Sequence, residues 1–126
     1  MGKLDDIFSG KICSRIDNLY YGVDDASRAN ESLRVLDDIQ GILQEFRMET
    51  NGLELDKSFN IQLATQFKNA AAQFIHLEEF YTAIRDGKEV PFDSELAKKY
   101  VSNLHLIFNS FKDYAIEIDR GYKKMD

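Results

Sequence analysis

The chain has 126 residues, is 44% hydrophobic and carries a formal net charge of −6, so it is long enough for one domain with a real core. This mild acidity argues against nonspecific binding to nucleic acid, and no apolar stretch approaches the roughly 18 residues that cross a membrane. The acidic N-terminal segment is unlike a signal peptide, and the one cysteine, Cys13, cannot form an internal disulfide. We therefore expect a cytoplasmic protein with a single domain over residues 1–126.

The first predicted helix runs from Leu4 to Tyr21. Its apolar residues recur at helical spacing. Gly10 weakens the start of this helix, because glycine disfavours a helix interior. Gly22 is a candidate C-cap, so we expect the helix to end there.

The second predicted helix covers residues 26–49. Asp24 and Asp25 precede it and offer an N-cap, with negative charge at the positive end of the helix dipole. Asn51-Gly52 should end this helix.

Two long apolar series dominate the C-terminal half and predict a helical hairpin. Their steps mostly alternate between three and four residues, which is the period of a seam between packed helices. The helix predicted over 58–86 carries Leu63, Phe67, Ala70, Phe74, Leu77, Tyr81 and Ile84. The helix predicted over 94–120 carries Ala97, Val101, Leu104, Phe108, Phe111, Ala115, Ile118 and Tyr122. Because the breaker run 86–91 separates them, we expect the two helices to fold back antiparallel.

The two series also predict which residues face each other. Partners in an antiparallel pair have position numbers with a constant sum, as Leu77 with Leu104 and Phe74 with Phe108 nearly do. Four alanines keep the middle of the 58–86 helix thin, so that a neighbouring backbone can approach it closely: Ala64, Ala70, Ala71 and Ala72. The predicted fold is all-α, an antiparallel four-helix bundle built on this long C-terminal hairpin, with the two N-terminal helices covering one of its sides.

No residue pattern predicts an enzyme. His76 and Glu79 share a helix face, but a dinuclear metal bundle needs such a motif on two helices and two further glutamates. We therefore expect His76 to be solvated, and His105 as well. Cys13 has no base nearby in the sequence and is interpreted as a small buried thiol. We predict no catalytic residue, no metal ligand and no cofactor.

Four acidic doublets have two interpretations. They could form a surface that imitates phosphates and occupies a basic groove of another protein, or they could be helix caps and solvated faces. Neighbouring Arg and Lys residues dilute the acids, which favours the second interpretation. The doublets are Asp5-Asp6, Asp24-Asp25, Asp37-Asp38 and Glu78-Glu79.

A polar, uncharged stripe on the 58–86 helix is the predicted contact with a partner. Gln73, His76 and Phe80 lie on it, outside the seam. The centres of protein interfaces combine aromatic anchors with few charges, so we predict these three residues as partner-binding. The alternative is that Phe80 packs under the first helix or under the loop of the 50s.

Residues Arg28 to Asp38 read Arg-Ala-Asn-Glu-Ser-Leu-Arg-Val-Leu-Asp-Asp, which resembles a segment of the small helical domain fused to some thiamine-phosphate synthases. A second segment, Phe67 to Glu78, is faintly similar to a later part of that domain. It has Ala71-Ala72 where the family has an Arg-Tyr pair, and the spacing between the two segments is longer here. We assign no site residue from this resemblance.

Three functional hypotheses follow. The leading one is a non-enzymatic, protein-binding bundle, such as a small cytoplasmic chaperone, adaptor or inhibitor that acts through a helix face. The alternative is a structural subunit of a homo- or hetero-oligomeric assembly, including a homodimer in contact through the first helix. The third is a small enzyme or ligand carrier with a pocket in the bundle core, lined by polar groups such as Tyr81, Tyr114 or Cys13. No binding to nucleic acid or to membranes is expected.

Overall fold

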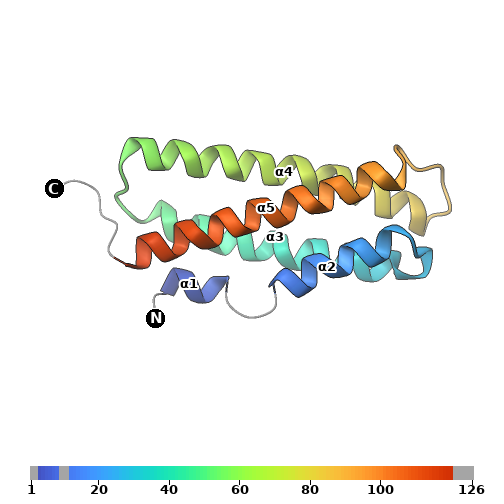
Figure 1. Ribbon diagram of the computed structural model, residues 1–126, viewed down its shortest axis with the longest axis horizontal. Helices are drawn as coiled ribbons and strands as arrows, with labels where there is room; N and C mark the ends of the chain where they lie inside the picture. Colours follow the sequence, from blue (N-terminus) through green and yellow to red (C-terminus); the bar gives the residue numbers. More distant parts are fainter. Residues whose placement is uncertain (1–2, 9–11, 121–126) are drawn as a thin grey trace.

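The computed structural model describes residues 3–8 and 12–120, and in these ranges it contains helices and no strands (Figure 1). The helices are α1 (Lys3–Ile7), α2 (Ile12–Val23), the 3-10 helix η1 (Ala26–Arg28), α3 (Ala29–Asn51), α4 (Lys57–Arg85) and α5 (Ser94–Asp119). None of the helices in the described part of the chain combines the length and the apolar character needed to cross a bilayer.

Helices α2 to α5 form a four-helix bundle in which consecutive helices are neighbours. Helix α2 packs against α3 and α5, and α4 packs against the same two helices from the other side. Short connections join helices that run in opposite directions along the long axis (Figure 1). The predicted all-α bundle is therefore confirmed, and so is the position of the N-terminal helices beside the C-terminal hairpin.

The first helix predicted over 4–21 is two helices in the structure. Helix α1 packs against α5 and α3 at one end of the bundle, and α2 occupies the other end (Figure 1). Gly10 lies outside the described residues. Gly22 does not end α2, which continues to Val23. Gly22 is instead buried at a close approach to α3, because a Cβ atom there would lie 2.0 Å from the Ser32 hydroxyl oxygen.

Aspartate side chains cap the N-termini of three helical segments, η1, α4 and α5. Asp56 Oδ1 accepts a hydrogen bond from the Phe59 amide at 2.8 Å at the start of α4. Asp25 accepts one from the Ser27 amide at 3.1 Å at the start of η1, which leads into α3. Such caps satisfy amides that have no partner within the helix. The second helix ends at Asn51-Gly52 as predicted, two residues beyond the predicted bound at 49.

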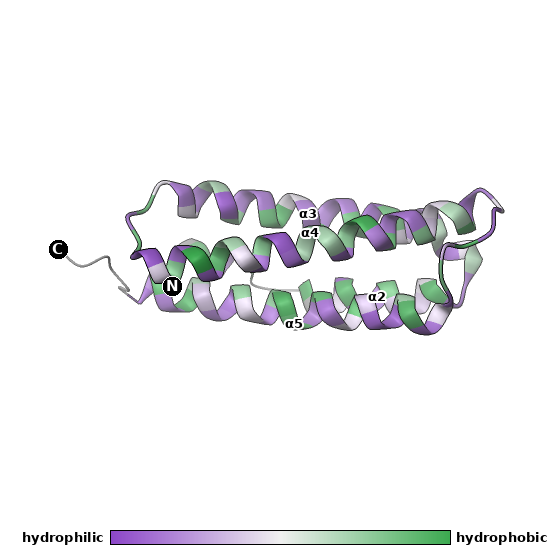
Figure 2. Cartoon of the chain, turned by 90° about the horizontal axis from the view of Figure 1, so that it is seen from above, coloured by the Kyte–Doolittle hydropathy of each residue, from purple (hydrophilic) through white to green (hydrophobic). Residues whose placement is uncertain are grey.

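Within the described residues, the apolar series of the C-terminal hairpin face the core, and Tyr122 of the second series lies outside those residues. Tyr81, Leu77, Leu104 and Phe111 are fully buried, and hydrophobic and hydrophilic residues alternate along each helix with the helical turn (Figure 2). Phe46 from α3 joins them, with its ring centroid 5.5 Å from that of Phe111. The core therefore extends between all four long helices, as the two predicted heptad series require.

The register of α5 along α4 differs from the prediction by about one helical turn. The prediction pairs Phe111 with Ala70, whereas the ring of Phe111 lies 4.8 Å from that of Phe67. The cause lies in the connection between the helices, where Phe92 folds back and stacks on Phe80 at 5.3 Å. Because the chain returns along α4 before α5 begins, α5 starts further down α4 than a tight turn would place it.

Candidate functional site

The face formed by α3 and α4 is hollowed, because α4 carries small side chains there. Ala64 and Ala71 are exposed, whereas Ala70 is buried against the core. The two helices lie side by side along their length (Figure 2), and the alanines leave a groove between them. We call this surface the α3–α4 groove, and its central part is lined by Gln40, Leu43, Gln44, Arg47, Phe67, Ala70, Ala71, Phe74, Ile75 and Glu78.

The floor of the α3–α4 groove is apolar. Its central hollow has a volume of about 200 Å³, and Leu43, Phe67 and Phe74 line it. Leu43 and Phe74 are buried members of the hydrophobic core, and Phe67 packs against that core while half-buried. The groove is therefore a place where the core of the bundle comes close to the surface.

The hollow continues in both directions along the two helices. Toward Leu53, in the connection between α3 and α4, a second hollow shares Arg47 and Ala71 with the central one. Toward Leu33, near the start of α3, a third hollow shares Ile75 and Glu78 with it. The α3–α4 groove thus has one connected course, long enough for several turns of a helix.

Large hydrophobic side chains are exposed on the two helices that form this face and on the connection between them. Ile75 is 58% exposed and lines the α3–α4 groove itself. Among the described residues, six large hydrophobic side chains are well exposed, and four of them belong to α3, α4 or the connection between these helices: Met48, Leu53, Ile61 and Ile75. Two of these four, Leu53 and Ile75, line the hollows, and exposed apolar side chains beside an apolar hollow are typical of a binding site.

The two ends of the α3–α4 groove carry opposite charges. Arg47 and Lys68 line the hollow toward Leu53, and no carboxylate lines it. The guanidinium of Arg47 lies over the ring of Phe67, with 5.5 Å between its Cζ atom and the ring centroid. At the other end, five carboxylates, among them Asp37 and Glu78, outnumber two cations. A partner in this groove would therefore meet a positive end and a negative end.

These groove residues were not predicted as a site from the sequence, although a signal is present. On α4, Lys68, Ala71, Ile75 and Glu78 follow steps of three and four residues, so they form a second heptad series on the outward face. This series mixes charged, small and apolar residues. A search for apolar periodicity in the sequence therefore does not detect this series.

Two of the three residues predicted to bind a partner lie half-buried between α4 and α5. Gln73 Oε1 accepts a hydrogen bond from the Asn103 amide at 3.2 Å. His76 stacks on Tyr100 with 4.7 Å between the ring centroids. Both side chains thus contribute to the packing of α4 on α5, and their role in binding stays a prediction.

Phe80, the third of these residues, is not available as an exposed anchor. Its side chain is only 2% exposed and stacks on Phe92 in the connection between α4 and α5. The alternative that Phe80 is packed is therefore the one that the structure supports. Its cover is Phe92, however, and not the first helix or the loop of the 50s.

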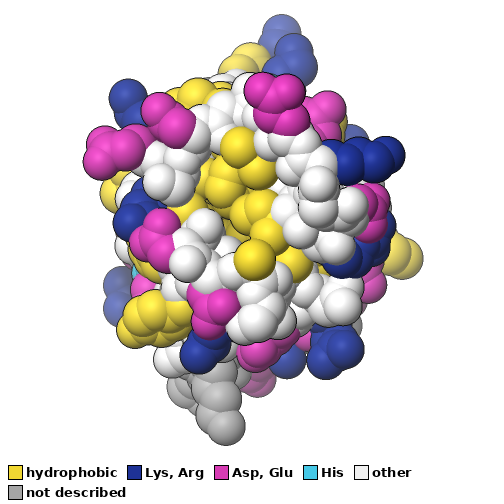
Figure 3. All heavy atoms as spheres, turned by 90° about the vertical axis from the view of Figure 1, so that its right-hand side faces the viewer, with side chains coloured by type: hydrophobic (Ala, Val, Ile, Leu, Met, Phe, Trp, Pro, Cys, Tyr) yellow, Lys and Arg dark blue, Asp and Glu magenta, His cyan; other side chains and the backbone are white. Residues whose placement is uncertain are grey.

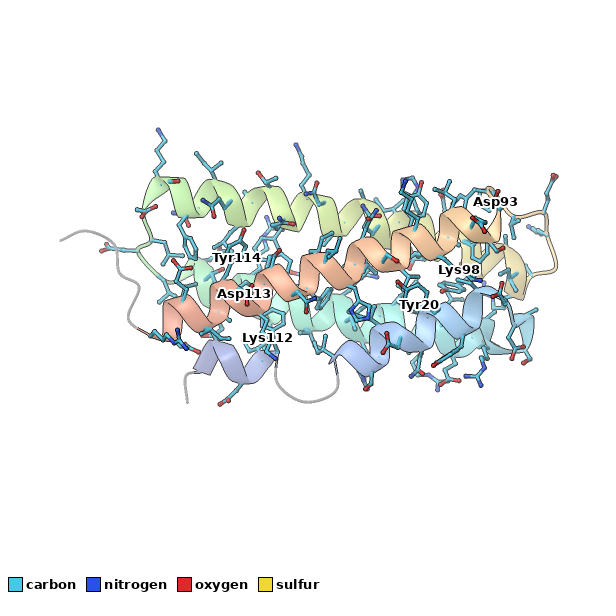
Figure 4. The ribbon with its side chains drawn as sticks, viewed as in Figure 1. Tyr20, Asp93, Lys98, Lys112, Asp113 and Tyr114 are labelled. Atoms are coloured by element: carbon cyan, nitrogen blue, oxygen red, sulfur yellow. The ribbon has the colours of Figure 1, made fainter. Side chains whose placement is uncertain are left out.

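His105 belongs to a polar contact between α2 and α5 and is half-buried, not exposed as expected. Its Nε2 atom lies 2.8 Å from Asp17 Oδ1, and its ring stacks on Tyr20 at 6.4 Å. Tyr20 lies between the two helices (Figure 4), and its hydroxyl is hydrogen-bonded to that of Ser102. Among the described residues, no three His, Cys, Asp or Glu side chains are grouped so that they could hold a metal ion.

The third hypothesis places Tyr81 and Tyr114 in a pocket inside the bundle. In the structure, both side chains pack between the helices. The Tyr81 hydroxyl donates a hydrogen bond to the Leu19 carbonyl at 2.5 Å, and burial raises the pKa of this tyrosine. Tyr114 packs edge-on against Phe59 at 5.4 Å. Within the described residues, every buried side-chain polar atom has a hydrogen-bond partner. The side chain of Cys13 lies outside the described part.

A second apolar area lies at the end of the bundle where α2 meets α3 and α4 meets α5. Figure 3 shows hydrophobic atoms there, bordered by acidic and basic side chains. Val90 and Phe92, in the connection at this end, are partly buried against the core. At this end of the bundle Phe92 stacks on Phe80.

Comparisons with protein-family models, with curated proteins and with solved structures found no significant match for this chain. The segment that resembles the helical domain of thiamine-phosphate synthases starts in η1, where Arg28 is paired with Asp25 at 3.2 Å, and continues into α3. Asp37, at the acidic end of the α3–α4 groove, lies in it.

Proposed function

We propose that this chain is a non-enzymatic, protein-binding helical bundle of the cytoplasm, an adaptor, inhibitor or small chaperone that acts through one helix face. The observation that carries the proposal is the α3–α4 groove, where the apolar floor of the core and the exposed Ile75 meet. Burial of such a surface against a partner removes apolar area from water, at about 25 cal/mol for each Å².

The shape of the groove favours a helical partner. Two antiparallel helices with small residues between them leave a channel that a third helix can enter with its apolar side. Ala71 and Ala64 allow the backbone of that helix to approach closely, and Gln40 and Gln44 offer hydrogen bonds at the rim. The combination of an apolar floor and a polar rim is typical of specific protein interfaces.

A second candidate function, a structural subunit of an oligomer, is supported by the charges of the groove. Its ends carry Arg47 and Lys68 on one side and Asp37 and Glu78 on the other. A surface with two opposite ends can pair with an inverted copy of itself. This candidate uses the same face, so both functions lead to the same first experiment.

Site-specific photo-crosslinking in the native host tests the use of this face. A photoreactive amino acid at position 75, in the α3–α4 groove, should give protein adducts on irradiation. The matched control is position 106 on α5, because Leu106 is 66% exposed and lies outside the groove. Adducts at position 106 with none at position 75 would contradict the proposed function.

A further inference from the structure

The outward face of α4 is complementary to itself when it is inverted. Along the helix the order is Lys68, Ala71, Ile75, Glu78. An inverted copy laid on this face places Lys68 opposite Glu78 and Ala71 opposite Ile75. Opposite charges then meet at the flanks, and a small side chain meets a large one at the centre.

The outward face of α3 has the same property. There the order is Asp37, Gln40, Gln44, Arg47. Inversion places Asp37 opposite Arg47 and pairs the two glutamines, whose amides can donate and accept hydrogen bonds. The charges of α3 and α4 are thus arranged in the same sense, with the cations at one end and the carboxylates at the other.

The centres of these two patterns lie at the same level of the bundle. The pattern of α3 is centred between Gln40 and Gln44, and that of α4 is centred between Ala71 and Ile75. All four of these residues line the central hollow of the α3–α4 groove. A single twofold axis can therefore pass through both centres, perpendicular to the helices and in the plane of the interface.

We propose that the partner bound at the α3–α4 groove is a second copy of this chain, paired about that twofold axis so that the two grooves face each other. Helix α3 then lies antiparallel on α3 of the second copy, and α4 lies on α4. Lys68 pairs with Glu78 of the second copy, and Arg47 pairs with Asp37 of the second copy. The inference rests on the proposed function, since it names the protein that the same face binds.

Two orientations of a twofold axis bring this face onto its copy, one perpendicular and one parallel to the helices, and charge decides between them. A twofold axis parallel to the helices would lay α4 on α3 of the second copy, so that Lys68 would face Arg47 and Glu78 would face Asp37, which costs free energy. The perpendicular axis replaces both repulsions with attractions. The face is about 20 Å long between Ala64 and Glu78 and about 20 Å wide across two helices, which places the contact among small interfaces that form reversibly.

Sedimentation equilibrium of the full chain and of two charge variants tests the proposal. The wild-type chain should show a reversible transition between monomer and dimer. Lys68→Glu alone brings two pairs of like charges together in a dimer, and so does Glu78→Lys alone, so each should dimerise at least about tenfold more weakly. In an equimolar mixture of the two variants both pairs are again opposite, so a heterodimer should form with an affinity close to that of the wild type.

Lys112→Glu on α5 is the matched control. It changes the net charge as Lys68→Glu does and replaces an exposed residue outside the groove, so dimerisation should remain unchanged. Three results would each overturn the proposal: a wild-type chain that stays monomeric, a Lys68→Glu variant that dimerises as the wild type does, or a mixture that forms no heterodimer. A monomeric chain that still crosslinks another protein at position 75 would reject self-pairing and keep the proposed function. A chain that does neither would reject both.

Discussion

Gly22 on α2 and Ser32 on α3 approach so closely that the glycine leaves no space for a side chain. A Cβ atom at position 22 would lie 2.0 Å from the Ser32 hydroxyl oxygen and 3.5 Å from the ring of Tyr81. Three helices therefore meet at this point, since Tyr81 comes from α4. Close contact of α2 with α3 depends on the missing side chain.

Gly22→Ala should destabilise the bundle by about 1–3 kcal/mol, because the added methyl group overpacks a buried contact. Urea unfolding followed by circular dichroism measures the change. The matched control is Gly41→Ala on α3, where no atom beyond the chain neighbours and the helix's own backbone lies within 4 Å of the added Cβ. That substitution should stabilise the protein by about 0.5–1 kcal/mol, because alanine favours an exposed helix interior. Equal effects of the two substitutions would contradict this account.

Tyr81→Phe should cost about 1 kcal/mol, because it removes the hydroxyl that donates to the Leu19 carbonyl and keeps the buried ring. Tyr81→Ala should cost about 3–5 kcal/mol, because it also leaves a cavity in the core. Tyr21→Phe is the control. Because Tyr21 is 62% exposed, this substitution should change the free energy of unfolding by less than about 0.5 kcal/mol. If Tyr81→Phe were as neutral as Tyr21→Phe, the hydrogen bond would not contribute to stability.

The stability of the protein should also fall at alkaline pH on account of Tyr81. Burial raises the pKa of Tyr81 above its ordinary value of 10.0, so the folded state holds the phenol neutral after the unfolded state has released its proton. The contribution of this group is complete below about pH 10 and is lost as the pH rises toward the folded-state pKa. The free energy of unfolding of the wild type should then decrease more steeply than that of Tyr81→Phe. Urea titrations at several alkaline pH values measure both slopes, which would be parallel if Tyr81 did not titrate in this way.

Ile75→Asp should leave the fold intact and weaken binding through the α3–α4 groove. The side chain is 58% exposed, so the free energy of unfolding should change by less than about 1 kcal/mol. A carboxylate at the apolar centre of an interface is costly to bury, so self-association should weaken at least about tenfold. Leu106→Asp makes the same chemical change at a side chain that is 66% exposed on α5, and sedimentation should show no loss there.

The faces of the long helices could be predicted from the sequence because helical periodicity is a local property. Leu77, Leu104 and Phe111 fall on the predicted seam and are fully buried. The register between α4 and α5 could not be predicted in the same way. It depends on Phe92, which leaves the connection and stacks on Phe80, and the spacing of apolar residues in the helices contains no information about that contact.

The burial of Phe80 could not be predicted from the sequence for a related reason. Phe80 lies outside the seam, and its neighbours on the helical wheel are polar, so the sequence leaves both an exposed anchor and a packed side chain open. A connection that folds back can bury such a residue from outside the seam, as Phe92 does. The α3–α4 groove was missed because its floor consists of core residues that become accessible only where Ala71 and Ala64 leave them uncovered.

The most direct test of the account is the concentration dependence of the backbone amide chemical shifts of the full chain. If copies pair through the α3–α4 groove, shifts should move on concentration for residues such as Arg47, Lys68 and Ile75. Those of Leu106 on α5 and Tyr20 on α2 should stay constant. Concentration-dependent shifts confined to α2 and α5, or none up to about millimolar concentration, would contradict the account.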